Sequence, residues 1–68
     1  MVDLNLLKNT INDRGVTIVS IANKVGTTRE GFYKKLSGET EFKASEIEKI
    51  TEALRLSKKE RDAIFFAQ

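Results

Sequence analysis

The chain has 68 residues, a formal net charge of +2 and 40% hydrophobic residues, which predicts one domain, residues 1–68, near the lower size limit for a self-supporting core. Because the sequence contains neither Cys nor His, it excludes disulfides, thiol or imidazole catalysis and the common zinc sites. It shows no pattern typical of an enzyme, a cofactor or a small-molecule site. The sequence also lacks an apolar run that could span a bilayer and a signal-peptide pattern, so we expect a soluble intracellular protein without membrane partners.

All predicted elements are helices, because the sequence contains no proline and no extended strand-like alternation. The first helix is expected to begin after Asp3, a typical N-cap, and to end at Gly15. Its inner face is predicted to consist of Leu4, Leu7 and Ile11.

Residues 17–38 predict two short helices joined by a glycine turn. The first is capped by Thr17, extends to Lys24 and is followed by Gly26, which interrupts the apolar stripe. That stripe consists of Ile21, Ala22 and Val25.

The second helix of this pair is expected to cover about residues 28–36, with Phe32 and Leu36 facing inward. Thr27 and Thr28 both offer capping hydroxyls, and Thr27 with Glu30 fits a capping box. The dipeptide at 37–38, Ser-Gly, closes the helix.

A loop at 39–43 is predicted next, with Phe42 as its anchor into the core. A fourth helix follows, for which Ser45 and Glu48 form a capping box and which ends near Leu56. Its buried stripe is predicted to contain Ile47, Ile50 and Leu54.

A fifth helix is predicted after Ser57, which forms a second capping box with Glu60. Ile64, Phe65 and Phe66 are consecutive and cannot share one face of a helix, so at least one aromatic ring must point away from the core. Two interpretations remain open. This turn either folds back over the first and fourth helices or supplies a dimer or partner contact through Phe65 and Phe66.

The helix at 28–36 is expected to present long polar side chains to solvent, namely Arg29, Glu30, Tyr33, Lys34 and Lys35 beside Gly31. Side chains of this kind on a short exposed helix are typical of base reading in the major groove. Residues 24–43 contain five basic and three acidic side chains, while the remaining segments are neutral in sum. Two interpretations follow: a helix-turn-helix that binds DNA, or an ordinary helical hairpin with a solvated face.

The pattern T-x-x-x-I-A-x-x-V-G-T-T-x-x-x-F-x-x-x-L-x-G over residues 17–38 resembles the Cro/CI-type helix-turn-helix family of phage repressors and their bacterial relatives. Phe42, the segment EIEKITEAL and the terminal ERDAIFFA are similar to small phage-type regulators of Gram-positive bacteria. The resemblance implies an all-α, five-helix lambda-repressor-like DNA-binding domain. It also implies a regulator acting on DNA in the cytoplasm of a bacterial host, at the nucleoid.

Two sets of DNA-contacting residues are implied by the resemblance. Base edges or flanking phosphates are assigned to Thr28, Arg29, Glu30 and Lys34. Backbone phosphates are assigned to Thr17, Tyr33, Ser37, Thr40 and Lys43. Alternatives stay open for several of them: Arg29 and Lys34 as solvated charges, Glu30 as a capping acceptor and Tyr33 as a half-buried packing residue.

Two departures from the family pattern lower the expected DNA affinity. Ile18 stands where many relatives have a Gln that contacts phosphate, and Glu39 and Glu41 place negative charge in the loop after the reading helix. Ile18 with Val19 is instead suited to a protein contact.

Two functions are therefore compared. The first is a Cro-like repressor that binds an inverted-repeat operator on double-stranded DNA as a homodimer. The second is an antirepressor that uses the same fold to bind a partner repressor and mask its reading helix.

Overall fold

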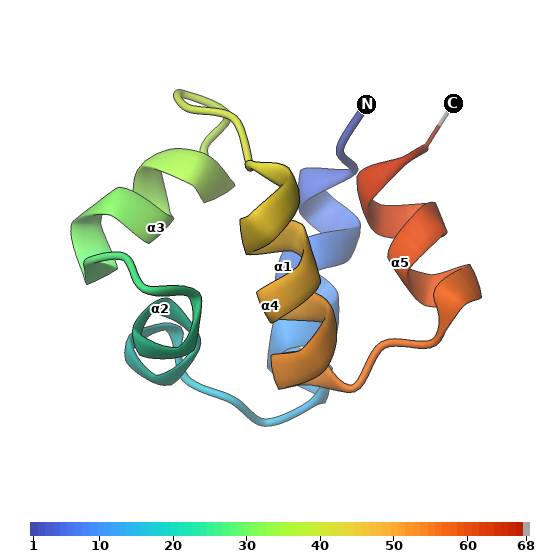
Figure 1. The fold of residues 1–68 in the computed structure, drawn as a ribbon, viewed down its shortest axis with the longest axis horizontal. Helices are drawn as coiled ribbons and strands as arrows, with labels where there is room; N and C mark the ends of the chain where they lie inside the picture. The colour runs from blue at the N-terminus through green and yellow to red at the C-terminus, as the bar shows by residue number, and fades with distance from the viewer. Residues whose placement is uncertain (68) are drawn as a thin grey trace.

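In a computed structural model that describes residues 1–67, the chain forms five α-helices (Figure 1). They are α1 (Leu4–Asp13), α2 (Ile18–Val25), α3 (Arg29–Leu36), α4 (Ala44–Leu54) and α5 (Lys58–Phe65). The all-helical prediction is confirmed for these residues; Gln68, the last residue of the expected domain, lies outside them. Figure 1 shows α2 and α3 on one side of α4, and α5 on the other. The two ends of the chain meet where the Asp3 N–H donates a hydrogen bond to the Ile64 C=O at 2.7 Å.

One cluster of buried apolar side chains draws on all five helices. Its six largest fully buried members are Phe32, Leu7, Ile21, Ile50, Leu54 and Ile64. Phe42 packs against this cluster from the α3–α4 loop, as predicted, and its ring makes edge contacts with Phe32 at 6.0 Å and with Phe65 at 5.7 Å between centroids. These edge-to-face contacts tie α3, the loop and α5 together.

Four of the predicted N-caps form as side-chain hydrogen bonds. The side chains of Asp3, Thr17, Thr28 and Ser57 each accept from a backbone N–H three residues later, at 3.0 to 3.1 Å. The Glu60 carboxylate also accepts from the Ser57 N–H at 2.9 Å, which completes the predicted capping box of α5.

The predicted capping box of Thr27 with Glu30 is wrong by one residue. Gly26 adopts the left-handed conformation (φ 87°), and the Thr27 N–H donates to the Ala22 C=O at 3.0 Å. Thr27 therefore still belongs to the end of α2, and Thr28 becomes the N-cap of α3. The third residue of α3 is then Gly31, which has no side chain to complete a box, so Glu30 has no capping role.

The predicted capping box of Ser45 with Glu48 is also wrong. Helix α4 begins at Ala44, and the Glu46 carboxylate accepts from the backbone N–H of the N-cap residue, Lys43, at 2.7 Å. The helix starts two residues early because Glu46 reaches back from the third helical position, where it caps the free N–H.

Phe65 and Phe66, at the end of α5, differ in burial; the sequence had not determined which of the two rings enters the core. Ile64 and Phe65 are buried, with 1% and 2% of their surface exposed, whereas Phe66, which follows the helix, is 55% exposed. The prediction of Phe65 as a partner or dimer contact is wrong, because its ring packs against Phe42 in the core. Of these two rings, only that of Phe66 is exposed enough to contact a partner.

Candidate nucleic-acid interface

The α2–α3 pair has the local geometry of a helix-turn-helix. Figure 1 shows α2 nearly end-on while α3 runs across the view, so the two helices cross steeply. The left-handed Gly26 makes this sharp change of direction without the steric cost that a Cβ would add. Phe32 and Leu36 turn the inner face of α3 into the core, and its opposite face is left at the surface.

The four side chains assigned to base reading all lie at the surface. Thr28, Arg29, Glu30 and Lys34 are exposed, at the N-terminal end and along the outer face of α3. Arg29 places its guanidinium carbon 5.7 Å from the centroid of the Tyr33 ring. A cation held over an aromatic face has fewer conformations to lose on binding, so Arg29 is partly oriented in the free protein.

The residues assigned to phosphate contacts lie in three places: the start of α2, α3 itself and the loop after α3. Thr17 is exposed at the N-terminus of α2, where its hydroxyl oxygen accepts from the Ser20 N–H and its hydroxyl proton remains free to donate. Ser37, Thr40 and Lys43 are exposed in the loop after α3, although the Ser37 hydroxyl already donates to the Lys34 C=O at 2.9 Å. Tyr33 is 47% exposed, so its ring is a surface group and not a core residue.

Lys35 is the one basic residue of α3 that the sequence misplaced. Its side chain is only 12% exposed, and its Nζ lies 3.1 Å from the Glu46 carboxylate and 3.1 Å from the Glu41 C=O, to which it donates. Burial raises the pKa of Glu46. The hydrogen bond from the Lys43 N–H and the Lys35 ammonium together lower it by a larger amount, so the pKa of Glu46 lies below its usual value. Lys35 therefore holds α3 to the start of α4 and is not available to DNA. The signal in the sequence was a Lys at i+3 from the buried Phe32, facing the same side of the helix.

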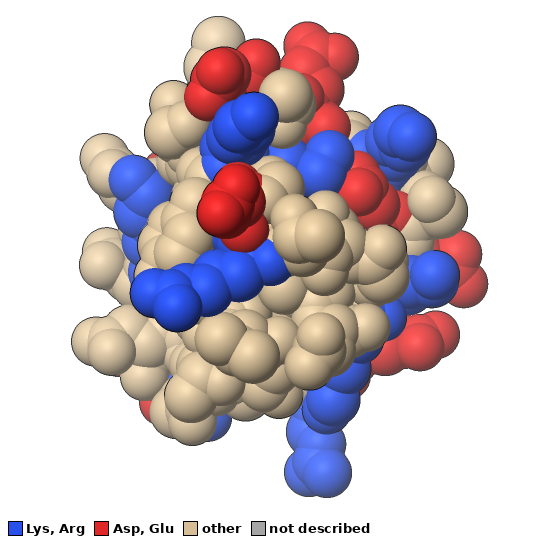
Figure 2. Space-filling view, turned by 90° about the vertical axis from the view of Figure 1, so that its left-hand side faces the viewer, with Lys and Arg blue, Asp and Glu red and all other residues tan. Residues whose placement is uncertain are grey.

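The surface around α3 is mixed in charge. Figure 2 shows basic side chains spread over this face and an uncharged area in its lower central part. Acidic side chains lie at the upper edge, where the α3–α4 loop runs, and also near the centre and along the right-hand side. Glu39 and Glu41 are exposed in that loop. With Lys35 paired to Glu46, four basic and three acidic side chains remain free over residues 24–43. This surface attracts phosphate less strongly than the sequence suggested.

Two side chains predicted for a protein contact lie at the start of α2. Val19 is 49% exposed, while Ile18 is half-buried and packs against the core. Ile18, Tyr33 and Ser37 line a shallow hollow of about 340 Å³ beside α3. The structure thus brings Ile18 of α2 beside Tyr33 and Ser37.

Within residues 1–67, no group of three Asp or Glu side chains lies close enough together to hold a metal ion. None of the helices in this part of the chain has the length and apolar character needed to cross a membrane. Comparison of the chain with models of protein families found no match, and comparisons with curated proteins and with solved structures found none either. The likeness to Cro/CI-type regulators therefore stays a resemblance, carried by the pattern of residues 17–38 together with Phe42 and the segments EIEKITEAL and ERDAIFFA.

Proposed function

We propose that the chain is a sequence-specific DNA-binding transcriptional regulator with a lambda-repressor-like fold. Helix α3 enters the major groove, where Arg29 donates to guanine, Lys34 reaches guanine or phosphate, and Glu30 accepts from cytosine. Two copies bind the half-sites of an inverted repeat about one helical turn apart and block transcription by occupancy, at the nucleoid of a bacterial host.

One observation carries this proposal: α3 buries Phe32 and Leu36 while it presents Arg29, Glu30 and Lys34 at the surface. A capped helix with an anchored inner face holds its outer side chains in fixed register, which base reading requires. Glu30 is free for this role because Gly31, and not Glu30, occupies the third position of the helix.

The test is binding to random double-stranded DNA at two salt concentrations, followed by selection of preferred sequences from a random library. A DNA reader shows affinity that falls steeply with salt and yields an inverted-repeat sequence. Absence of any DNA shift at low salt, with the protein folded, would refute the proposal.

A second function is favoured by exposed apolar and acidic side chains of α2, α3 and the α3–α4 loop. An antirepressor would use Val19 and Tyr33 as apolar contacts, and Glu39 and Glu41 as substitutes for phosphate, to cover the basic reading helix of a partner repressor.

Replacement of Glu39 and Glu41 by Lys separates the two functions. A DNA reader gains affinity for all DNA and a steeper salt dependence, because more phosphates are neutralised. An antirepressor loses its complex with the partner and gains no operator preference. Val19→Ser serves as the apolar counterpart, since Val19 is exposed whereas Ile18 packs partly on the core.

A further inference from the structure

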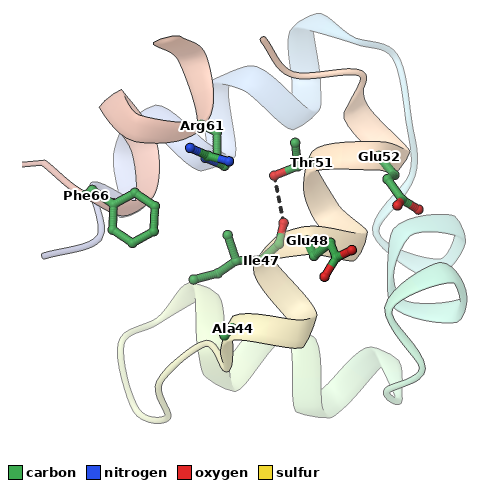
Figure 3. A pocket seen from close by; sticks show the side chains of 7 residues that line it. All are labelled: Ala44, Ile47, Glu48, Thr51, Glu52, Arg61 and Phe66. Atoms are coloured by element: carbon green, nitrogen blue, oxygen red, sulfur yellow. Dashed lines mark hydrogen bonds between the residues drawn. The ribbon is translucent and has the colours of Figure 1, made fainter. Parts of the chain in front are cut away.

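A groove lies between α4 and α5, apart from the helix-turn-helix. It has a volume of about 670 Å³, within the range of roughly 300 to 1,000 Å³ typical of binding clefts. Figure 3 shows Phe66 and Arg61 extending from the α5 side toward Ile47 on α4. The most exposed aromatic ring within residues 1–67 thus forms one wall of this groove.

Two polar residues that line the groove, Thr51 and Arg61, already use their polar groups in interactions within their own helices. The Thr51 hydroxyl donates to the Ile47 C=O at 2.7 Å (Figure 3), so this hydroxyl is already hydrogen-bonded within α4. Arg61 lies with its guanidinium carbon 5.9 Å from the Phe66 ring centroid and donates two hydrogen bonds to the Asp62 carboxylate, at 2.9 and 3.1 Å. The charge of Arg61 is therefore compensated within α5.

The rim on the α4 side carries two carboxylates that form no ion pair within residues 1–67. Glu48 and Glu52 are exposed and one helical turn apart, and Figure 3 shows both turned outward, away from Phe66. The three ion pairs formed within residues 1–67 use other carboxylates, those of Glu60, Glu46 and Asp62. Lys24 and Lys49 line a separate hollow with Glu52, beyond the rim.

We propose that this groove binds a basic amphipathic helix of another protein. An apolar side chain of that helix fills the space between Ile47 and Phe66, and two Lys or Arg side chains spaced i, i+4 face Glu48 and Glu52. The spacing of the two Glu residues matches one turn of such a helix, and Arg61 is already paired with Asp62, so the unpaired charges that line the groove are those of Glu48 and Glu52. An acidic helix would instead be repelled by Glu48 and Glu52 on the rim.

The groove is separate from the candidate DNA interface. Figure 1 shows α5 on the side of α4 opposite to α2 and α3. A partner helix in this groove would leave α3 uncovered, so the chain could hold DNA and a protein at the same time. This role goes beyond the proposed DNA binding and does not depend on it.

The probe is a 14-residue helical peptide with Leu along one face and Lys on both flanks, beside a control peptide with every Lys replaced by Glu. Binding is measured by fluorescence anisotropy and mapped by NMR chemical shifts on the full chain. The Lys peptide is expected to shift signals of α4 and α5 near Ile47 and Phe66, and the Glu peptide is expected not to bind.

Two charge-matched double variants test the position of the contact. Glu48→Lys with Glu52→Lys should weaken binding of the Lys peptide about tenfold, while Glu39→Lys with Glu41→Lys makes the same change in net charge on the other face and should change it less than about twofold. Phe66→Ser should also weaken it, and all these positions are exposed, so the variants are expected to fold.

Several results would overturn the proposal. These are no binding of the Lys peptide, equal weakening by both double variants, or shifts confined to α2 and α3. Sedimentation that shows a dimer of the wild type, converted to monomer by Phe66→Ser, would show instead that a second copy covers the groove. DNA affinity measured in parallel should be unchanged in the Glu48 and Glu52 variant, so failure here is distinct from failure of the proposed DNA binding.

Discussion

Replacement of Phe32 by Ala should remove much of the stability of the fold. The Phe32 ring is fully buried, with 0% of its surface exposed, and makes an edge contact with Phe42 at 6.0 Å. Truncation of a buried Phe to Ala costs about 3 to 5 kcal/mol, which includes loss of the aromatic pair. A chain of 68 residues is expected to have a free energy of unfolding of roughly 3 to 10 kcal/mol. The variant is therefore expected to be largely unfolded or close to it.

The assay is urea unfolding followed by circular dichroism at 222 nm. Phe66→Ala is the matched control, because it deletes the same ring from a position that is 55% exposed, and it should cost less than about 1 kcal/mol. Phe32→Leu keeps most of the apolar volume and should cost about 1 to 2 kcal/mol. A Phe32→Ala variant that unfolds at the same urea concentration as Phe66→Ala would refute the burial of α3 and the placement of the reading helix.

Three further predictions concern specificity, backbone strain and pH. Arg29→Ala should cost about 1 to 3 kcal/mol on the preferred operator and flatten discrimination at one base pair; an equal loss on all sequences in a competition assay would assign Arg29 to phosphate alone. Arg55 ends α4 in the left-handed conformation at φ 55°, so Arg55→Gly should raise stability by about 0.5 to 1 kcal/mol, whereas Arg55→Ala should not, and a thermal melt of both variants decides. The folded-state pKa of Glu46 lies below its ordinary value of 4.5, so its contribution to stability is present above that pH and is lost as the pH falls through the folded pKa. Glu46→Gln should therefore cost about 1 kcal/mol near pH 7 and progressively less in acid. A cost that is constant across this range would contradict the lowered pKa, to which the hydrogen bond from the Lys43 N–H and the ion pair with Lys35 both contribute.

Much of the fold could be predicted from sequence because local signals and apolar periodicity agree. Asp3, Thr17 and Ser57 each stand before an apolar helical stripe, and each caps a helix. The two wrong capping boxes share one cause. More than one Ser, Thr or Glu lay close to each helix start. Which of them caps the helix depends on where the preceding turn ends, and for α3 the left-handed Gly26 determines that point.

The consecutive aromatic residues at the end of α5 show where periodicity stops being informative. The angle between successive helical residues requires Phe65 and Phe66 to diverge, but it does not say which ring enters the core. Phe65 does so because Phe42 reaches it from the α3–α4 loop. That contact joins distant parts of the chain, and no local pattern encodes it.

The position of Lys35 matters more for function than the shifted helix caps do. The sequence counted this cation toward DNA binding, but its ammonium group pairs with Glu46 within the protein. Its partner, Glu46, lies beyond the loop in the next helix and also caps that helix, so one carboxylate fixes both α3 and the start of α4. The loop between them carries Glu39 and Glu41 at the surface. A single copy therefore offers few free cations to phosphate. The proposed DNA binding would accordingly need base contacts by α3 and a second copy on the same DNA to reach useful affinity. The same shortage of charge explains why a protein partner on this face stays a physically reasonable rival to DNA.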